Sequence, residues 1–243
     1  MRVLILGGTS GIGLALARHY LQQGDAVAVA GRDLARLPAD LGAGAAQLQA
    51  YALDITDAPA LAGVMQQFSA PGLDLLIVAA GFYFNTRHHP LDAATTLRML
   101  RTNVGGMEQA FGLAAETMLA QQSGQLVAIA SVAGLLHDYP GASLYSATKR
   151  SVLSLCATYR TALQPFGIAV TAIVPGYVDT AQLRALNQGD ASHKPFILSE
   201  AQAVVQITQA IRLRQAVCAF PWQMRWLVAL LNHLPAWLLA LRR

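Results

Sequence analysis

Short, continuously apolar runs alternate along this chain with longer segments in which apolar residues recur at helical spacing. The runs predict strands near residues 2–6, 26–30, 47–52, 74–79, 125–130, 168–174 and 216–219. The longer segments predict helices near residues 12–23, 57–68, 94–120, 144–163 and 199–213. Such alternation is typical of right-handed crossovers that build a parallel sheet with helices on both faces. The pattern therefore predicts one α/β domain of the doubly wound, Rossmann-like class.

A glycine-rich turn follows the first predicted strand, Val3–Leu6, and opens the first predicted helix. Gly7, Gly11 and Gly13 allow a tight turn and a close approach of the backbone. The helix that begins near Ile12 points free N–H groups and its positive dipole end at this turn, which suits a pyrophosphate. The spacing is G-x-x-x-G-x-G, and a glycine-rich turn between a strand and a helix can also be purely structural.

The end of the second predicted strand bears on which dinucleotide the turn accepts. An acidic residue there binds the ribose 2′-hydroxyl of NAD, whereas a nearby Arg accommodates the 2′-phosphate of NADP. Here Gly31 ends the strand and Arg32 follows it, and a guanidinium suits bidentate binding of phosphate. The sequence therefore favours NADP(H) over NAD(H). The alternative is that Arg32 is a solvated loop residue and that Asp33 binds the ribose.

A Tyr and a Lys in the middle of the chain have the spacing of a proton-transfer pair. Tyr145 and Lys149 are four residues apart in a predicted helix, which places them on one face. An ammonium near a phenol lowers the Tyr pKa, so the pair can exchange a proton with a carbonyl or an alcohol. This spacing also occurs by chance on many helices. Ser131 strengthens the functional interpretation, because it follows an apolar strand whose carboxyl end faces the ligand crevice.

Together these motifs resemble the compact form of the short-chain dehydrogenase/reductase family. The resemblance runs from Met1 to about Thr180, and more loosely to Phe220. It implies seven strands in the order 3-2-1-4-5-6-7. It also implies a catalytic tetrad, which consists of Asn103, Ser131, Tyr145 and Lys149.

The same resemblance assigns a role to each member of the tetrad in moving a hydride between nicotinamide and a carbonyl or alcohol carbon. Tyr145 would donate the proton in reduction, and Lys149 would lower its pKa and hold the nicotinamide ribose. Ser131 would hydrogen-bond the substrate oxygen as charge develops there. Asn103 would position a water that links Lys149 to solvent.

The residues that the resemblance implies for cofactor binding are spread over the glycine-rich turn, the strand ends, the tetrad and the segment that closes over the nicotinamide. They are Gly7, Thr9, Ser10, Gly11, Ile12, Gly13, Arg32, Asp54, Ile55, Ala80, Gly81, Tyr145, Lys149, Pro175, Gly176, Val178 and Thr180. One departure is visible: the chain has Val78-Ala79-Ala80-Gly81 where the family has Asn-Asn-Ala-Gly. The missing polar side chains predict lower local rigidity rather than altered chemistry.

Three segments are expected to select the substrate: residues 82–84, residues 133–139, and a lid over residues 177–198. They are rich in apolar side chains and have no cluster of arginines, which favours a lipophilic ketone or alcohol. The candidate lining residues are Phe82, Leu135, Tyr139, Tyr177 and Leu183.

Residues 221–243 form an apolar extension of the catalytic domain, which spans residues 1–220. They contain all three tryptophans, and no Asp or Glu follows Glu200. The nearly apolar stretch 226–241 is shorter than the roughly 20 residues that span a bilayer. Trp and Arg beside leucines are typical of a helix that lies in a membrane interface. The alternative is a pair of short helices that cover the substrate pocket or a subunit contact.

Composition limits the other classes of function. Hydrophobic residues make up 54% of the 243 residues, charged residues 12%, and the net charge is +4 at pH 7. This charge is too small and too scattered to indicate nucleic-acid binding. No residues have metal-ligand spacing, so no metal is expected, and the short apolar start is unlike a signal peptide, which favours a cytoplasmic protein. By the resemblance, the helices near 94–120 and 144–163 pair copies of the chain into a homodimer or homotetramer.

The sequence therefore predicts an NADP(H)-dependent oxidoreductase that acts on a carbonyl or alcohol, with Tyr145 as its acid and base. Two alternatives stay open. One is a catalytically idle NADP(H)-binding sensor, which the complete tetrad disfavours because sensors of this fold often lack the Tyr or the Lys. The other is a membrane-peripheral interaction protein whose main functional element is the segment 221–243.

Overall fold

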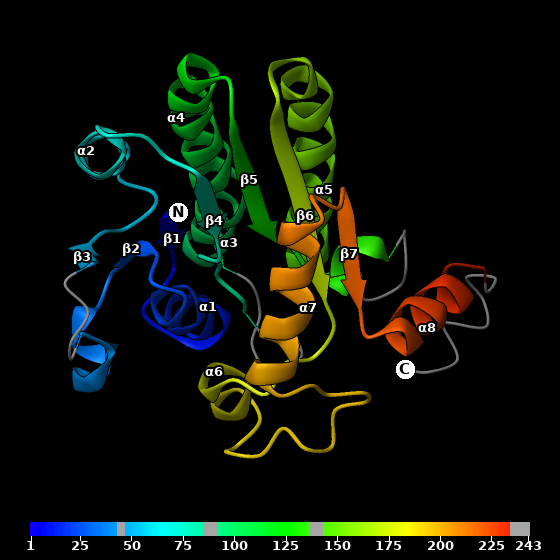
Figure 1. The fold of residues 1–243 in the computed structure, drawn as a ribbon. Helices are drawn as coiled ribbons and strands as arrows, with labels where there is room; N and C mark the ends of the chain where they lie inside the picture. Colours follow the sequence, from blue (N-terminus) through cyan, green and yellow to red (C-terminus); the bar gives the residue numbers. More distant parts are fainter. Residues whose placement is uncertain (43–46, 85–91, 137–142, 234–243) are drawn as a thin grey trace.

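A computed structural model of the chain describes residues 1–42, 47–84, 92–136 and 143–233 (Figure 1). The strands are β1 (Arg2–Leu6), β2 (Ala26–Gly31), β3 (Leu48–Ala52), β4 (Leu75–Val78), β5 (Gly124–Ile129), β6 (Ile168–Pro175) and β7 (Val217–Phe220). They form a seven-stranded parallel sheet in the order β3-β2-β1-β4-β5-β6-β7. Fold class and strand order are both confirmed.

Helices cover both faces of the sheet (Figure 1). One layer consists of α1 (Gly11–Gln22) and α7 (Glu200–Arg212), and the other of α2 (Ala58–Ser69), α4 (Gly106–Gln121) and α5 (Leu144–Leu163). The shorter helices are α3 (Ala93–Leu100), α6 (Ala181–Ala185) and α8 (Trp222–His233). Short 3₁₀ turns are η1 (Leu34–Arg36), η2 (Ala39–Gly42), η4 (Val132–Leu135) and η5 (Gln164–Phe166).

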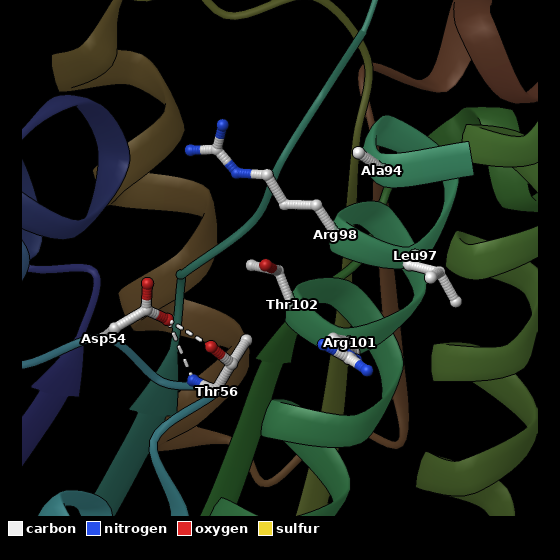
Figure 2. Close-up of a pocket in the computed structure, with 7 residues that line it drawn as sticks. All are labelled: Asp54, Thr56, Ala94, Leu97, Arg98, Arg101 and Thr102. Carbon is white, nitrogen blue, oxygen red and sulfur yellow. Dashed lines mark hydrogen bonds between the residues drawn. The ribbon is translucent and has the colours of Figure 1, made fainter. Parts of the chain in front are cut away.

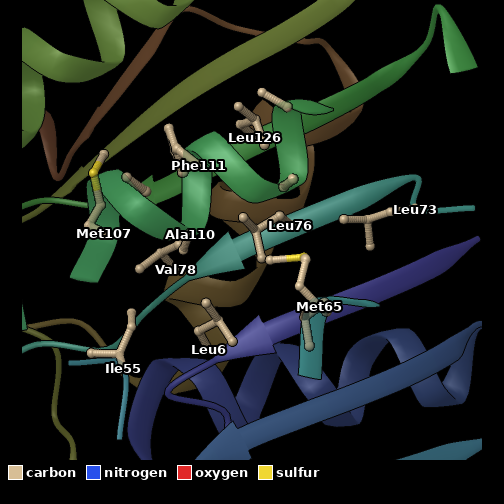
Figure 3. Packing of buried hydrophobic residues seen from close by; sticks show 14 of the residues in the cluster. Leu6, Ile55, Met65, Leu73, Leu76, Val78, Met107, Ala110, Phe111 and Leu126 are labelled. Atoms are coloured by element: carbon tan, nitrogen blue, oxygen red, sulfur yellow. The ribbon is translucent and has the colours of Figure 1, made fainter. Parts of the chain in front are cut away.

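The larger part of the core lies between the sheet and the layer of α2, α4 and α5. Leu6 and Leu76 of the sheet, together with Met65 of α2 and Phe111 of α4, are almost fully buried there. Figure 3 shows these side chains interleaved between the strands and the helices. Each such side chain contributes roughly 1.5–3 kcal/mol by its burial. This packing holds the carboxyl ends of β1, β4 and β5 in fixed positions, and the candidate site lies at those ends.

The predicted helix over 94–120 is confirmed, but it contains a turn that the sequence pattern does not show. A π-helical turn, η3 (Arg101–Gly105), separates α3 from α4. The turn brings Asn103 inward, where its exposed fraction is 2%. Gly106 then passes close to the β3 end, since a Cβ on it would lie 2.9 Å from the backbone oxygen of Ile55. The apolar spacing continues through the turn, so the sequence pattern does not reveal it.

The chain leaves the sheet at β7 and continues into α8, which lies beyond the β7 edge of the sheet (Figure 1). Met224 and Val228 are the buried residues of this helix. No helix within the described residues is long and apolar enough to cross a membrane. The second half of the predicted tail, residues 234–243, lies outside the described residues.

Candidate active site

The glycine-rich turn between β1 and α1 is packed so closely that two of its positions exclude side chains. Gly7 has a φ of +87°, and a Cβ on it would lie 2.4 Å from the backbone nitrogen of Ala80. A Cβ on Gly13 would lie 2.2 Å from the carbonyl oxygen of Gly7. Ser10 is the N-cap of α1 and makes no side-chain capping bond, and no acidic residue lies in the first turn. The open helix N-terminus therefore fits the pyrophosphate of a dinucleotide.

Backbone hydrogen bonds brace the centre of the sheet where the predicted polar side chains are missing. The N–H groups of Ala79 and Ala80 both donate to the carbonyl oxygen of Leu6, each at 2.8 Å. These bonds tie the end of β4 to the end of β1. The small side chains of Ala79 and Ala80 also suit the close approach of Gly7 to Ala80.

The end of β2 has no room for the acidic residue that would select NAD. A Cβ on Gly31 would lie 2.6 Å from the hydroxyl oxygen of Thr9, which is itself buried. Asp33 is engaged locally, since it caps η1 and forms an ion pair with Arg36 at 3.3 Å. Arg32 is exposed and forms no ion pair with any other described residue. Among these residues, Arg32 is therefore the basic group that has no ion-pair partner in the described part of the chain.

Asp54 follows β3 and lies at the same edge of the sheet. Its Oδ1 accepts hydrogen bonds from the backbone N–H of Thr56 at 2.9 Å and from the Thr56 hydroxyl at 2.8 Å. Partial burial raises the pKa of Asp54, but these bonds and the guanidinium groups of Arg32 and Arg98 outweigh it, so the pKa is lowered. The carboxylate is therefore ionised at neutral pH. The neighbouring Ile55 is buried in the core.

Tyr145 and Ser131 meet just beyond the carboxyl end of β5. Tyr145 lies in the first turn of α5, and Ser131 caps η4. Burial raises the pKa of Tyr145 to about 12, a hydrogen bond with Ser131 lowers it, and nearby Tyr83 raises it. The rings of Tyr83 and Tyr145 pack edge to face with 4.9 Å between their centroids. The phenol of Tyr145 therefore holds its proton at neutral pH.

Lys149 lies one turn further along α5, and its ammonium group is buried below Tyr145. Its Nζ donates a hydrogen bond to the carbonyl oxygen of Ile129 at 2.8 Å and lies 5.8 Å from the centroid of the Tyr145 ring. Burial lowers the pKa of Lys149 to about 8. In this structure Ser131, and not Lys149, exerts the lowering effect on the pKa of Tyr145. The Lys149 ammonium is directed to the β5 carbonyl, and the effect predicted for it on the pKa of Tyr145 stays a prediction.

Asn103 joins the segment after β4 to α5. Its Oδ1 accepts from the Phe82 backbone N–H at 2.7 Å, and its Nδ2 donates to the Phe82 carbonyl at 2.9 Å and to the Thr148 hydroxyl at 3.1 Å. A Cβ on Gly81 would lie 3.5 Å from the Nζ of Lys149 and 3.7 Å from the Oδ1 of Asn103. Ser131 thus meets α5 at Tyr145, and Asn103 meets the same helix one turn further on, at Thr148. Thr148 was not among the predicted residues, although its place beside Lys149 in the sequence was a usable signal.

The segment after β6 lies over the glycine-rich turn. A Cβ on Gly11 would lie 3.4 Å from the Cγ2 of Thr180, and Thr180 caps α6. Val178 forms an isolated parallel bridge with Leu198, which closes the base of the predicted lid. Both residues lie close to the body of the domain. The predicted cofactor residues Gly11, Val178 and Thr180 are therefore neighbours of one another across the entrance to the turn.

The C-terminal helix adjoins both the β6 end and the turn that carries Ser131. The N–H of Gly176, which follows Pro175, donates to the carbonyl oxygen of Phe220 at 2.7 Å. The Nδ2 of Asn232 in α8 donates to the carbonyl oxygen of Leu135 at 2.8 Å. Leu135 is a predicted substrate residue, whereas Asn232 was not predicted. The helix α8 therefore packs on η4. This contact is what the alternative interpretation of residues 221–243, helices that cover the substrate pocket, would require.

The other predicted substrate residues have different surroundings. The ring of Phe82 is covered by the guanidinium of Arg98, whose Cζ lies 4.3 Å from the ring centroid. Tyr83, which lies in the predicted substrate segment 82–84 but was not among the candidate lining residues, is the residue of that segment that contacts Tyr145. Tyr177 and Leu183 both belong to the predicted lid. Tyr139 lies outside the described residues.

Comparison with known proteins supports a relationship over most of the chain. The family model described as short chain dehydrogenase matches residues 1–191. An uncharacterized oxidoreductase of Myxococcus xanthus is 30% identical over 226 residues, which cover 91% of this chain and 87% of that protein. A cis-4-hydroxycyclohexanecarboxylate dehydrogenase of Sinomonas cyclohexanicum is 31% identical over 191 residues, with 75% of each chain covered. A solved short-chain dehydrogenase from Sphingobium yanoikuyae, in complex with NADPH, has a TM-score of 0.80 and 25% identity and covers 96% of each chain.

The fold and the comparisons define a nicotinamide-dependent oxidoreductase. The chain belongs to the short-chain dehydrogenase/reductase family.

Proposed function

We propose that this protein is an NADP(H)-dependent carbonyl reductase in which Tyr145 donates the proton. The observation that carries the proposal is the arrangement at the end of β5, where Tyr145 is hydrogen-bonded to Ser131 and Lys149 lies one turn away. A nicotinamide cofactor supplies the hydride when it is bound. The residues of this chain provide the proton, the charge stabilisation and the positioning.

The protonation states at this site suit reduction of a carbonyl. A phenol with a pKa of about 12 is protonated at neutral pH, and so it can donate to a substrate oxygen. The Ser131 hydroxyl, already bonded to Tyr145, holds that oxygen and stabilises the charge that develops on it. Lys149 then places a positive charge near the phenolate that remains.

Residues at the end of β2 support NADP(H) as the preferred cofactor. Gly31 offers no carboxylate to repel a phosphate, and Asp33 is engaged by η1 and Arg36. The exposed guanidinium of Arg32 is therefore the group that would bind the 2′-phosphate. The glycine-rich turn would hold the pyrophosphate, and Lys149 the nicotinamide ribose.

The surroundings of Tyr145 support a lipophilic substrate. The ring of Tyr83 packs on Tyr145, and η4, which contains Leu135, directly follows Ser131 in the chain. Tyr177 and Leu183 belong to the segment over the cofactor turn and add apolar surface to it. The Sinomonas relative is named for a secondary alcohol on a cyclohexane ring that also bears a carboxylate, so its name supports an alcohol on an apolar ring but not an uncharged substrate.

The test is NADPH oxidation with a series of ketones of increasing chain length, with Tyr145→Phe as the control. We expect turnover to rise with chain length and to fall by roughly 10²- to 10⁴-fold in the variant. Fluorescence titration would show NADPH binding within about threefold of wild type, because the phenol hydroxyl adds at most one hydrogen bond to it. Full activity of Tyr145→Phe would overturn the proposal. NADPH binding by the wild type without turnover of any ketone would favour the idle sensor.

We also propose that copies of this chain pair through α4 and α5. The two helices lie side by side on one face of the sheet (Figure 1). Gly112 of α4 is half-buried and Ser151 of α5 is exposed, and such small residues suit close packing of helices from two copies. Light scattering should give a mass two or four times the 25.8 kDa of one chain, and a monomer would contradict the proposal.

The surface of α8 favours a second role, peripheral contact with an anionic membrane. Trp222, Trp226 and Leu230 recur every fourth residue and are 65%, 71% and 60% exposed. They form a stripe opposite the buried Met224 and Val228, and no acidic residue follows Glu200 in the sequence. An exposed stripe of Trp and Leu without nearby acids suits a lipid interface.

Co-sedimentation with phosphatidylserine vesicles would test this role. We expect the wild type to bind and the Trp222→Ser/Trp226→Ser variant to lose binding. Val205→Ser provides a control, because Val205 is 62% exposed but belongs to α7. No binding by the wild type, or equal binding by the α8 variant, would contradict it.

A further inference from the structure

A cavity of about 340 Å³ opens beside the π-helical turn, between the end of β3 and α3 (Figure 2). Its lining residues are Asp54, Thr56, Ala94, Leu97, Arg98, Arg101 and Thr102. The volume lies within the range of small-molecule sites. Asp54 and Arg98 carry opposite charges, but no ion pair within the described part of the chain joins them. The carboxylate of Asp54 and the guanidinium of Arg98 therefore line a common cavity without forming an ion pair with each other.

The guanidinium of Arg98 is held flat on an aromatic ring. Its Cζ lies 4.3 Å from the centroid of Phe82, and the Phe82 backbone is fixed by two hydrogen bonds with Asn103. A planar guanidinium has two faces, so the contact with Phe82 leaves the second face for another flat group. Figure 2 shows Arg98 extending toward the Asp54 side of the cavity, whereas Arg101 lies on the other side of the helical turn.

Asp54 contributes a free acceptor to the same cavity. Its Oδ1 receives both hydrogen bonds from Thr56, and its Oδ2 has no hydrogen bond with any described residue. Burial raises the pKa of the carboxyl, whereas the Thr56 bonds, Arg32 and Arg98 lower it, so the group is anionic. A flat cation and an anionic acceptor complement a purine that carries an amino group. Guanidinium planes stack on such bases, and a carboxylate accepts from the amine.

The family resemblance already implies that Asp54 contacts the adenine of the cofactor. We propose that Arg98 is a further binding residue there, whose guanidinium stacks on the adenine ring. This inference rests on the proposed cofactor site. Stacking on the base does not involve the ribose 2′ position. Arg98 therefore strengthens the binding of NADPH and NADH equally, and discrimination between them is left to Arg32.

The experiment measures dissociation constants for NADPH and NADH by nicotinamide fluorescence in four proteins: wild type, Arg98→Met, Arg101→Met and Arg32→Ser. Arg98→Met should weaken the binding of both dinucleotides by the same factor, roughly 2- to 30-fold, the range of cation–π stacking. Arg101→Met removes an arginine from the same cavity that does not lower the pKa of Asp54, and it should leave both constants unchanged. Arg32→Ser should weaken the binding of NADPH alone.

Arg98→Lys and 5′-AMP sharpen the result. The lysine variant keeps the charge but loses the plane, so it should show most of the loss of the methionine variant. Competition by 5′-AMP, which carries the adenine without nicotinamide, should weaken in Arg98→Met by the same factor as the binding of NADPH. Unchanged constants in Arg98→Met, or a loss confined to NADPH, would overturn the role of Arg98 and leave the cofactor site intact. Failure of the wild type to bind either dinucleotide would instead overturn the proposed cofactor site and this inference with it.

Discussion

The region that holds the cofactor and the region that closes over the substrate are built in different ways. Around the glycine-rich turn, backbone packs on backbone, and a Cβ on Gly7 or Gly13 would lie within 2.4 Å of a main-chain atom. On the substrate side, long side chains make the contacts, such as Tyr83 on Tyr145 and Asn232 on η4. The first region tolerates almost no change of residue. The second can exchange side chains while the backbone keeps its course.

This difference explains how one fold accommodates many substrates. Dinucleotide binding needs a backbone that approaches the phosphates, and this requirement is the same for every substrate. Substrate choice depends on side chains in loops and on the C-terminal helix, which a fixed sheet presents at its edge. Three substitutions test the contrast, from the least tolerant position to the most tolerant one.

Gly13→Ala should have the largest effect. The added Cβ would lie 2.2 Å from the carbonyl oxygen of Gly7, which is backbone and cannot rotate away. We expect the free energy of unfolding to fall by about 3 kcal/mol and dinucleotide binding to be lost. Urea unfolding and NADPH titration would measure both. Gly63→Ala on α2 is the matched control, because a Cβ there meets nothing within 4 Å and should stabilise the helix by up to about 1 kcal/mol. Equal behaviour of the two variants would refute the steric argument.

Much of the cofactor region could be predicted from the sequence because its determinants are local. Glycines at fixed spacing after an apolar strand indicate the turn, and Gly31-Arg32 indicates the end of β2. The strand order follows from the alternation of elements together with the family resemblance. Even here the reason for Gly31 was hidden, since its closeness to Thr9 is a contact between residues that lie far apart in the sequence.

The substrate region was less predictable because its contacts are made in space rather than along the chain. The π-helical turn keeps the apolar spacing of a continuous helix, so the inward position of Asn103 was visible only in the structure. Asn232 lies 97 residues from Leu135, and no local pattern connects them. Burial raises the pKa of Tyr145 and lowers that of Lys149, and the spacing of the two residues in the sequence does not report burial.

Lys149→Met should have the second largest effect of the three substitutions, because the buried ammonium of Lys149 makes the free energy of unfolding depend on pH. Burial lowers its pKa to about 8, whereas an unfolded Lys titrates near about 10.4. Between these values the unfolded state binds more protons, so the free energy of unfolding should rise with pH. Relative to Lys149→Met, we expect a rise on the order of 1–2 kcal/mol from about pH 7 to 9.5. The raised pKa of Tyr145 acts in the opposite direction, but only above about pH 10, where the unfolded phenol titrates.

Urea unfolding at several pH values would measure this dependence. Lys194→Met, which removes the only other lysine of the chain, is the control and should follow the wild type. If the curves of wild type and Lys149→Met ran parallel from pH 7 to 9.5, the ammonium of Lys149 would not be buried as the structure has it. That outcome would also weaken the proposal that its charge stabilises the phenolate.

Asn232→Ala should have the smallest effect, because it removes one side-chain contact from the tolerant region. The lost hydrogen bond to Leu135 should lower the free energy of unfolding by about 1 kcal/mol. If η4 shapes the substrate pocket, KM for a ketone should rise by roughly 2- to 5-fold with kcat nearly unchanged, since Ser131 and Tyr145 keep their own hydrogen bond. Leu230→Ala on the exposed side of α8 should change neither quantity. An equal fall of kcat and kcat/KM in Asn232→Ala would mean that α8 positions the reacting groups themselves, and the boundary between the two regions would then run through Ser131 rather than beyond it.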